Sequence, residues 1–310
     1  MTPIEIVITY PLPQNLIERI QAISPRLKIT VYPARDAEAI SSDRWSQTEI
    51  LYTDGLLPDI SKTPRLRWVQ SHTTDFEFTK QSLLVQKEGL VFTNMSGVNA
   101  NAVAEYVVMV MLALGHHFGQ FISPEKFEQN SKEPLKTGQN IHGAVVGIVG
   151  YGSIGREIAR LLQPFGVTIL ATKRDVMNPK DMGYYIQGFG DPEGDLFHRL
   201  YPSQAMRTML KECNYILLTL PYTEGTHHLI NDNIFDIIKP YSYLINISHP
   251  EIIDMAALTK AVTDKKIVGF ASDTKDMDIL VEDLNYGKLA NLIMTLCAST
   301  GVSGDSNCLK

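Results

Sequence analysis

Three glycines in one short segment have the spacing of a phosphate-binding turn. Gly150, Gly152 and Gly155 form a GxGxxG pattern between the apolar run Ala144–Val149 and the helical pattern Ser153–Gln163. The first glycine permits a tight turn, the second lets the backbone approach a pyrophosphate, and the third lets the helix sit close to the strand. The helix N-terminus then offers free N–H groups to the anion. A simple tight connection is the alternative. The residues predicted to bind a dinucleotide pyrophosphate are Gly150, Gly152, Ser153, Ile154 and Gly155.

The next predicted strand, Val167–Ala171, ends in polar residues that can select between two dinucleotides. An acidic residue about twenty positions after the glycines would accept a hydrogen bond from a free ribose 2′-hydroxyl. Here Thr172 is followed by Lys173 and Arg174, whose charges favour a 2′-phosphate instead. We therefore include these three residues in the cofactor site and expect NADP(H) to be favoured over NAD(H). The alternative is that both cations are solvated and that Asp175 binds the ribose.

Composition indicates an acidic globular chain with small partners. The 310 residues suffice for two domains at roughly 100–200 residues each, and the formal net charge is −6 with a pI of about 5.8. There is no block of five or more basic residues. Nucleic acid and anionic membranes are therefore not expected partners, and a small molecule is.

Cysteine usage and hydrophobic runs favour the cytoplasm. Cys213, Cys297 and Cys308 are far apart and include no CxxC pair, so neither a disulfide framework nor a metal site is expected. The segment Met1–Tyr10 lacks a basic flank and holds a glutamate in its apolar run, which predicts a first strand and not a signal peptide. The longest apolar run, Tyr106–Gly115, is about half a membrane span, so no membrane segment is expected.

Apolar β-rich runs alternate with helical patterns through most of the chain. Strands separated by helices predict parallel sheets with right-handed crossovers, and hence an α/β fold with two doubly wound domains. The first array spans roughly residues 1–95 and the second roughly 140–275, with an inserted surface loop at Asn178–Asp195. Predicted strands are Ile4–Thr9, Lys28–Tyr32, Ile50–Tyr52, Trp68–Gln70, Val91–Thr93, Ala144–Val149, Val167–Ala171, Tyr215–Leu220, Tyr243–Ile247 and Ile267–Ala271. Predicted helices lie near Asn15–Ile23, Asp36–Ser41, Asn99–Phe118, Ser153–Gln163, Ser203–Lys211, Asn231–Ile237 and Met255–Val262.

Five further segments occur in an order and spacing typical of one enzyme family. They are Leu66–Ser71, Asn94–Glu105, Leu220–Ile230, Leu244–Ser248 and Ile267–Asp273. Together with the glycine motif they resemble the D-isomer-specific 2-hydroxyacid dehydrogenases, the family that includes phosphoglycerate dehydrogenase and glyoxylate/hydroxypyruvate reductase. The resemblance covers most of the chain.

The resemblance implies two domains and a set of ligand contacts. Residues 1–98 would form a flavodoxin-like substrate-binding domain toward which the C-terminal residues 285–310 return. Residues 99–284 would form a Rossmann domain that binds NAD(P). Matching the family's motifs adds the cofactor contacts Leu220, Pro221, Thr226, Ile247, Ser248 and Asp273. It also gives the substrate contacts His72, Thr73, Thr74, Ser96 and Gly97. An alternative for Asp273 is that it only caps a loop.

The family's chemistry normally uses three side chains, and each position is changed here. The arginine position holds His249, the glutamate falls at or near Asp278, and the histidine falls at Cys297. Losing the arginine removes a planar cation that binds a carboxylate at two points. Losing the histidine removes the usual proton donor to the alkoxide. His72 enters as a replacement because Ser71–Asp75 stands where the family has a glycine-rich substrate loop. The candidate catalytic residues are therefore His249, Asp278, Cys297 and His72.

Each of these candidates has a structural alternative. His249 can be a neutral, hydrogen-bonded loop histidine, and Asp278 can belong to a solvated acidic loop. Cys297 can be a small buried hydrophobe, and its reference pKa of about 8.5 suits proton donation poorly. The pairs His116–His117 and His227–His228 are interpreted as structural, because adjacent positions on a helix do not face each other.

Two functions remain open on these grounds. The first is an NADP(H)-dependent oxidoreductase that transfers a hydride between the nicotinamide and a small 2-oxo or 2-hydroxy acid, with acid–base work moved to His249 or His72. The second is a dinucleotide-binding pseudoenzyme that acts as a sensor or interaction protein. The helix Asn99–Phe118 and the segment after it resemble the region through which the family forms dimers, so a homodimer is expected.

Overall fold

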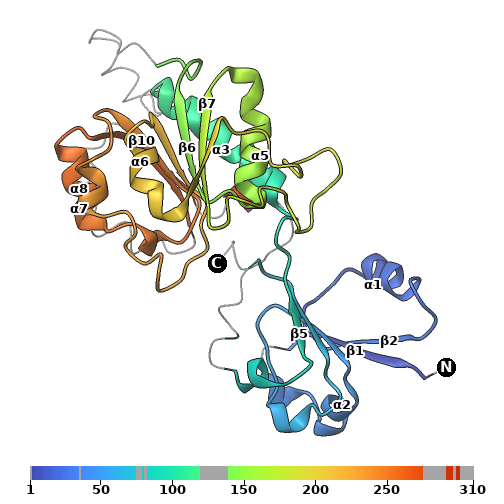
Figure 1. Cartoon of the computed structure of the whole chain (residues 1–310). Helices are drawn as coiled ribbons and strands as arrows, with labels where there is room; N and C mark the ends of the chain where they lie inside the picture. Colours follow the sequence, from blue (N-terminus) through green and yellow to red (C-terminus); the bar gives the residue numbers. More distant parts are fainter. Residues whose placement is uncertain are drawn as a thin grey trace. The chain divides into compact units, whose positions relative to one another are not determined.

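The computed structural model describes residues 2–34, 36–74, 79, 82–118, 139–274, 291–295 and 298–300. The chain divides into a smaller unit, Met1–Ser96, and a larger unit, Gly97–Lys310. Each unit is built on one sheet (Figure 1). Within the described ranges, no helix combines the length and the apolar character needed to span a bilayer.

The smaller unit is a five-stranded parallel sheet in the order β2-β1-β3-β4-β5. Its core packs Val7, Leu51 and Val69 from the strands against Trp45 and Leu84, all fully buried. This strand order reverses direction between β1 and β3, which makes that point a topological switch. The elements are β1 (Ile4–Ile8), α1 (Gln14–Gln21), β2 (Leu27–Val31), α2 (Ser42–Gln47), β3 (Ile50–Thr53), β4 (Trp68–Ser71) and β5 (Val91–Thr93).

The predicted helix at Asp36–Ser41 is wrong in its position. The structure has a short 3-10 helix at Ala37–Ala39, and α2 begins only at Ser42. The cause lies in the caps, because Asp36 accepts a hydrogen bond from the Glu38 N–H and Ser41 accepts one from the Arg44 N–H. A serine whose hydroxyl caps a helix marks its start, so the longer helix follows Ser41.

The larger unit is a seven-stranded parallel sheet in the order β12-β11-β10-β9-β6-β7-β8. Two parallel sheets with interleaved helices confirm the predicted α/β class with two doubly wound domains. The strands are β6 (Val145–Val149), β7 (Thr168–Lys173), β8 (Arg199–Pro202), β9 (Tyr215–Leu218), β10 (Ser242–Asn246), β11 (Ile267–Asp273) and β12 (Leu292–Thr295). The helices are α3 (Ala100–Gly115), α5 (Ser153–Leu162), α6 (Met206–Leu210), α7 (Asp232–Phe235) and α8 (Met255–Thr263).

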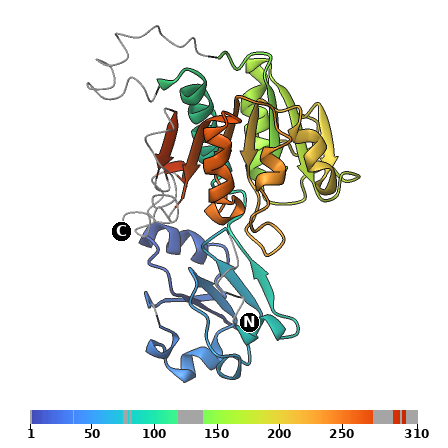
Figure 2. The same cartoon turned by 90° about the vertical axis from the view of Figure 1, so that its left-hand side faces the viewer.

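Helices cover both faces of the larger sheet, as Figures 1 and 2 show from two sides. Strand β6 alternates between these layers. Val146 and Ile148 pack with α3 and α5, whereas Val149 packs with α6, α7 and α8. The order of strands reverses between β6 and β9, which is where ligands bind in open α/β sheets. The GxGxxG turn therefore lies at the switch point.

Strands β8 and β12 of the larger sheet are not among the strands predicted from the sequence. Strand β8 was not predicted, because it has only four residues and includes an arginine and a proline at the edge of the sheet. Strand β12 pairs with β11 in the larger sheet and lies beyond residue 284, the predicted end of the nucleotide-binding domain. Residues 275–290 and 301–310 lie outside the described part of the chain.

Candidate functional site

Each glycine of the turn meets a different spatial constraint. Gly150 has a φ of 109°, and a Cβ on it would lie 2.9 Å from the Thr219 carbonyl oxygen. A Cβ on Gly155 would lie 2.6 Å from the Gly150 carbonyl oxygen, so only glycine lets α5 start this close to β6. A Cβ on Gly152 would meet no atom within 4 Å. The turn thus closes tightly on two sides and leaves the Gly152 side open.

The open side coincides with the uncapped start of α5. Gly152 is the N-cap residue and supplies no side-chain acceptor for the first N–H groups of the helix. A helix N-terminus with free N–H groups and its positive dipole end attracts an anion. The residues present therefore fit a dinucleotide pyrophosphate, with the backbone of Gly152, Ser153 and Ile154 in the binding role.

Two threonines hold the turn in this shape. The buried Thr172 accepts a hydrogen bond from the Gly150 N–H at its hydroxyl, 3.1 Å, and another from the Tyr151 N–H at its carbonyl, 2.8 Å. Thr219 donates its hydroxyl to the Gly150 carbonyl, 2.7 Å. Thr172 was predicted as a cofactor contact, and the structure places its hydroxyl on the turn.

The charged residues that end and follow β7 differ in how they are paired. Lys173 donates its ammonium to the carbonyls of Asn178 and Lys180, and burial, followed by the nearby Arg156, lowers its pKa. Asp175 accepts hydrogen bonds from the Asn178 side chain, 2.6 Å, and the Met177 N–H, 3.0 Å. Arg174 is exposed, and no hydrogen bond or ion pair involves it among the described residues.

The loops after β9 and β10 are tied to each other beside the turn. Ser248 accepts a hydrogen bond from the Leu220 N–H at its hydroxyl, 2.9 Å, and the Ile247 N–H donates to the Leu218 carbonyl. Thr226 donates its hydroxyl to the Pro221 carbonyl, 2.9 Å. These predicted cofactor contacts therefore gather at one edge of the sheet.

Asp273, at the end of β11, is hydrogen-bonded to other residues of the protein. Its carboxylate accepts hydrogen bonds from the Thr295 hydroxyl, 2.6 Å, and from the N–H groups of Ala298 and Ser299, 2.8 Å each. Only 8% of Asp273 is exposed. This arrangement is the loop-capping alternative given for this residue.

His249 lies within a cluster of titratable side chains at the same edge. Its ring stacks on Tyr222 with centroids 4.3 Å apart, and its Nδ1 accepts a hydrogen bond from the Glu251 N–H, 3.3 Å. The Tyr222 hydrogen bond, and then the charge of His249, hold the pKa of the Glu251 carboxyl below its usual value. His227 and His228 stack on each other at 3.9 Å, and His227 meets Tyr222 edge to face.

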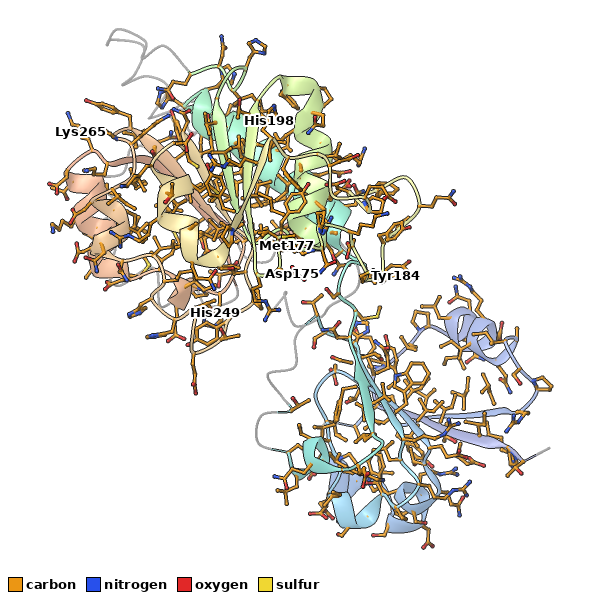
Figure 3. The ribbon with its side chains drawn as sticks, viewed as in Figure 1. Asp175, Met177, Tyr184, His198, His249 and Lys265 are labelled. Atoms are coloured by element: carbon orange, nitrogen blue, oxygen red, sulfur yellow. The ribbon has the colours of Figure 1, made fainter. Side chains whose placement is uncertain are left out.

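Sequence reasoning missed Tyr222 and Glu251, and it interpreted His227–His228 only as structural. The positions of Tyr222 and Glu251 after predicted strands could have identified them. Tyr222 follows β9 and Glu251 follows β10, and the carboxyl ends of neighbouring parallel strands meet at one edge. Figure 3 shows His249 at the same end of the larger unit as Asp175, with His198 and Lys265 at the opposite end.

A second cluster occupies the carboxyl edge of the smaller sheet. His72, directly after β4, shares a 2.6 Å hydrogen bond between its Nδ1 and the Tyr52 hydroxyl. Tyr10, two residues after β1, stacks on the His72 ring with centroids 3.8 Å apart. Burial, and then Tyr10, raises the pKa of Tyr52 to about 12, so this phenol keeps its proton. Which of the two atoms donates in the shared hydrogen bond follows the tautomer of His72.

The predicted substrate contacts next to His72 are held by hydrogen bonds within the smaller unit. The Thr73 N–H donates to the Ser71 hydroxyl, 3.0 Å, and the Thr74 carbonyl accepts from the Asn94 side chain, 2.9 Å. The same Asn94 accepts a hydrogen bond from the Ser96 N–H, 3.1 Å. Gly97 has a φ of 90° and begins the larger unit.

Two of the candidate catalytic residues, Asp278 and Cys297, lie outside the described residues. Where the structure does describe the chain, three or more histidine, cysteine or acidic side chains nowhere gather as metal ligands would. The larger unit thus carries a backbone turn that fits a dinucleotide and a histidine cluster at the carboxyl edge of its sheet. The smaller unit, taken by itself, carries a histidine cluster at the carboxyl edge of its own sheet.

The strand order and the glycine turn define a Rossmann-type dinucleotide-binding unit. The sequence profile described as "D-isomer specific 2-hydroxyacid dehydrogenase, NAD binding domain" matches residues 108–296. The chain belongs to this family.

Individual relatives are distant. Glyoxylate reductase of Thermococcus onnurineus is 29% identical over 219 residues, 68% of this chain and 60% of that protein. The (S)-sulfolactate dehydrogenase of Chromohalobacter salexigens is 29% identical over 213 residues, 68% of this chain and 63% of that protein. The matched region thus spans about three fifths of the length of these relatives. The crystal structure of D-lactate dehydrogenase from Aquifex aeolicus has a TM-score of 0.66 at 21% identity, covering 98% of this chain and 90% of that one.

Proposed function

We propose that this chain is an oxidoreductase that acts on CH–OH donors and transfers a hydride between NADP(H) and a small 2-oxo or 2-hydroxy acid. The observation that carries the proposal is the glycine turn at the switch point, which is closed at Gly150 and Gly155 and open at Gly152. When bound, the reduced nicotinamide supplies the hydride. Family membership supports this chemistry over dinucleotide binding alone.

The preference for NADP(H) rests on the end of β7. Lys173 is already bonded to two loop carbonyls, so Arg174 is the residue proposed to meet a 2′-phosphate. Its guanidinium can make charge-assisted bonds to phosphate oxygens. We expect Arg174→Ala to weaken NADPH binding about tenfold while leaving NADH binding within twofold, since one charge-assisted contact is worth roughly this factor. Equal losses for both nucleotides would contradict the preference.

The proton for the alkoxide is assigned to one of two histidines. Each Nδ1 has a partner: that of His72 shares a hydrogen bond with the Tyr52 hydroxyl, and that of His249 accepts one from the Glu251 N–H. We assign both Nδ1 atoms as acceptors, so that each neutral ring carries its proton on Nε2, from which it can be given to an oxygen. The substrate carboxylate is assigned to the segment His72–Thr74 with Ser96 and Gly97.

The test has two stages. Nicotinamide fluorescence titrations with NADPH and NADH measure binding, and assays with glyoxylate, hydroxypyruvate, pyruvate and bulkier 2-oxo acids then measure turnover. We expect micromolar NADPH binding and reduction of at least one acid. Tight binding without turnover on any acid would refute the enzyme and leave a dinucleotide-binding protein. Absence of binding by either nucleotide would refute both.

A homodimer is proposed through α3. One face of this helix lines an apolar groove together with Leu161 and Phe165. Met109 of α3 and Phe118, which follows the helix, also line the groove and are 54% and 58% exposed. Exposed apolar surface of this kind favours burial against a second copy. Light scattering should give twice the mass of the chain, and Met109→Lys with Phe118→Lys should give a monomer.

We place the protein in the cytoplasm, where its cysteines would stay reduced.

A further inference from the structure

The loop between β7 and β8, residues 174–198, is attached to the glycine turn by the turn's own side chains. Tyr151, between Gly150 and Gly152, donates its hydroxyl to the Asp191 carboxylate, 2.6 Å. Arg156, directly after Gly155, donates to the carbonyls of Asp191 and Pro179, 2.5 Å each. Tyr151 and Arg156 are each only 2% exposed. The phosphate turn and the β7–β8 loop therefore form one hydrogen-bonded unit.

Further hydrogen bonds hold the root of the loop. Asp191 accepts three more hydrogen bonds, from the N–H groups of Gly194, Asp195 and Leu196, at 2.9–3.1 Å. The buried Glu157 accepts one from the Gly190 N–H. The Arg156 Nε makes no hydrogen bond, but it lies 3.6 Å from an Asp181 carboxylate oxygen. Burying charged groups is costly unless they are paired, so these bonds and this ion pair favour one position of the root. The predicted surface loop at Asn178–Asp195 is thus buried at its root.

The tip of the loop, Met182–Gly188, has the opposite character. Tyr184, Tyr185 and Ile186 are 60%, 46% and 39% exposed. These three neighbouring side chains form a candidate contact surface, because burying them against a ligand would remove apolar area from water. The root is therefore held by hydrogen bonds, while the tip exposes two aromatic rings to solvent.

The tip lies against the start of α5. Tyr184, Tyr185 and Ile186 line one small cavity together with Ser153, the first residue of α5, and with Gly97. A Cβ on Gly97 would lie 2.4 Å from the Tyr184 carbonyl oxygen and 3.4 Å from the Ser153 hydroxyl. Figure 3 shows Tyr184 at the end of the larger unit that also carries Asp175 and His249. The two tyrosines are thus next to the helix N-terminus that fits the pyrophosphate.

The geometry points to Tyr184 and Tyr185 as additional contacts of the dinucleotide, donating their phenol hydroxyls to its diphosphate oxygens. The Tyr151–Asp191–Arg156 network is the device that positions them. Tyrosine suits the role because its hydroxyl donates to an anion while its ring excludes water, and few rotatable bonds must be ordered. This inference rests on the proposed binding of a dinucleotide and adds a second, side-chain wall to a backbone site.

The test compares two double variants of the same loop. Y184A/Y185A removes the proposed contacts, and M177A/M182A is the matched control, since both methionines are more than 80% exposed and neither lines the cavity. Calorimetric titration with NADPH should give a dissociation constant about tenfold weaker for the tyrosine variant, the size of one or two lost hydrogen bonds to an anion. The methionine control should stay within twofold. Melting temperatures without ligand should agree among the three proteins.

A second measurement locates the effect and separates the two proposals. Hydrogen exchange of the wild-type backbone amides in residues 182–188 should slow when NADPH is added. Wild-type binding with an unchanged tyrosine variant, or with unchanged exchange at the tip, would overturn the tyrosine contacts and leave the proposed function intact. Failure of the wild type to bind any dinucleotide would instead overturn the proposed function, and this inference with it. Y184F/Y185F should weaken binding like the alanine variant, because the hydroxyls make the contact.

Discussion

At the end of β6 the larger unit presents backbone to a ligand, whereas at the ends of β1, β3 and β4 the smaller unit presents aromatic side chains. The glycine turn lacks side chains, and a Cβ on Gly152 would meet no atom within 4 Å, which is the space we propose for the pyrophosphate. The cluster of Tyr10, Tyr52 and His72 works by stacked rings and one 2.6 Å hydrogen bond. Backbone N–H groups recognise an anion whatever group is attached to it, whereas side chains can be varied to suit one substrate.

The largest expected effect concerns the proton donor. His72→Gln and His249→Gln should separate the two candidates, because only the residue that protonates the alkoxide lowers kcat by about 10²–10⁴-fold. His142→Gln, before the amino end of β6, is the control and should keep wild-type kcat. The measurement is steady-state reduction of the best acid found, at saturating NADPH. Full activity in both variants would show that neither histidine supplies the proton.

Gly150 and Gly152 provide the next contrast. Gly150→Ala forces a side chain into a left-handed backbone against the Thr219 carbonyl, so it should cost about 1–3 kcal/mol of stability and most of the dinucleotide affinity. Gly152→Ala meets no protein atom within 4 Å, so it should leave the melting temperature unchanged and weaken NADPH binding about tenfold. Thermal melts and fluorescence titrations check both. A Gly152→Ala protein with wild-type affinity would place the pyrophosphate elsewhere.

Asp191 should make stability depend on pH. Burial opposes its ionisation, but the Tyr151 hydroxyl and three backbone N–H groups outweigh this and lower its pKa. A carboxyl with a lowered folded pKa adds stability above its unfolded pKa of about 3.9, and this stability is lost as the pH falls through the folded value. Asp191→Asn should therefore cost about 1–3 kcal/mol at pH 7, and less below pH 4. Urea denaturation at several pH values measures the difference. A cost that stays constant with pH would contradict the charged pairing.

The smallest effect is expected in the smaller unit. Tyr52→Phe removes one half-buried hydrogen bond to Nδ1 of His72, worth about 0.5–1.5 kcal/mol of stability. It also removes the group that fixes the tautomer, so ¹⁵N spectra of the His72 ring should change from one tautomer to a mixture. Tyr32→Phe, on the same sheet, serves as the control. An unchanged spectrum would show that another contact sets the tautomer.

The parts that could be predicted from the sequence are the local ones. The roles of Gly150, Gly152 and Gly155 follow from spacing within six residues, and the alternation of strands and helices gives both sheets. The short elements were lost, because β8 has four residues and no apolar pattern, and because the caps at Asp36 and Ser41 moved a helix. A family resemblance could point to His249 and His72 but not to their partners.

Those partners come from distant positions that only the folded sheet brings together. Tyr52 lies 20 residues from His72 and meets it because β3 and β4 pair in parallel. Tyr151 lies 40 residues from Asp191, and nothing in the glycine motif specifies what its second residue must contact. A single sequence does not reveal such contacts. Correlated substitutions at two positions across many related sequences can reveal them.

The attachment of the β7–β8 loop to the glycine turn has a consequence for anyone who re-engineers this protein. The loop looks like a module that could be shortened or exchanged to alter cofactor choice, since its tip is exposed. Removing the loop would leave the Arg156 guanidinium, 2% exposed, without the Asp191 and Pro179 carbonyls that accept its hydrogen bonds. An uncompensated buried cation of this kind costs several kcal/mol. A viable exchange would have to replace Tyr151 and Arg156 together with the loop, so these distant positions must be changed as one block.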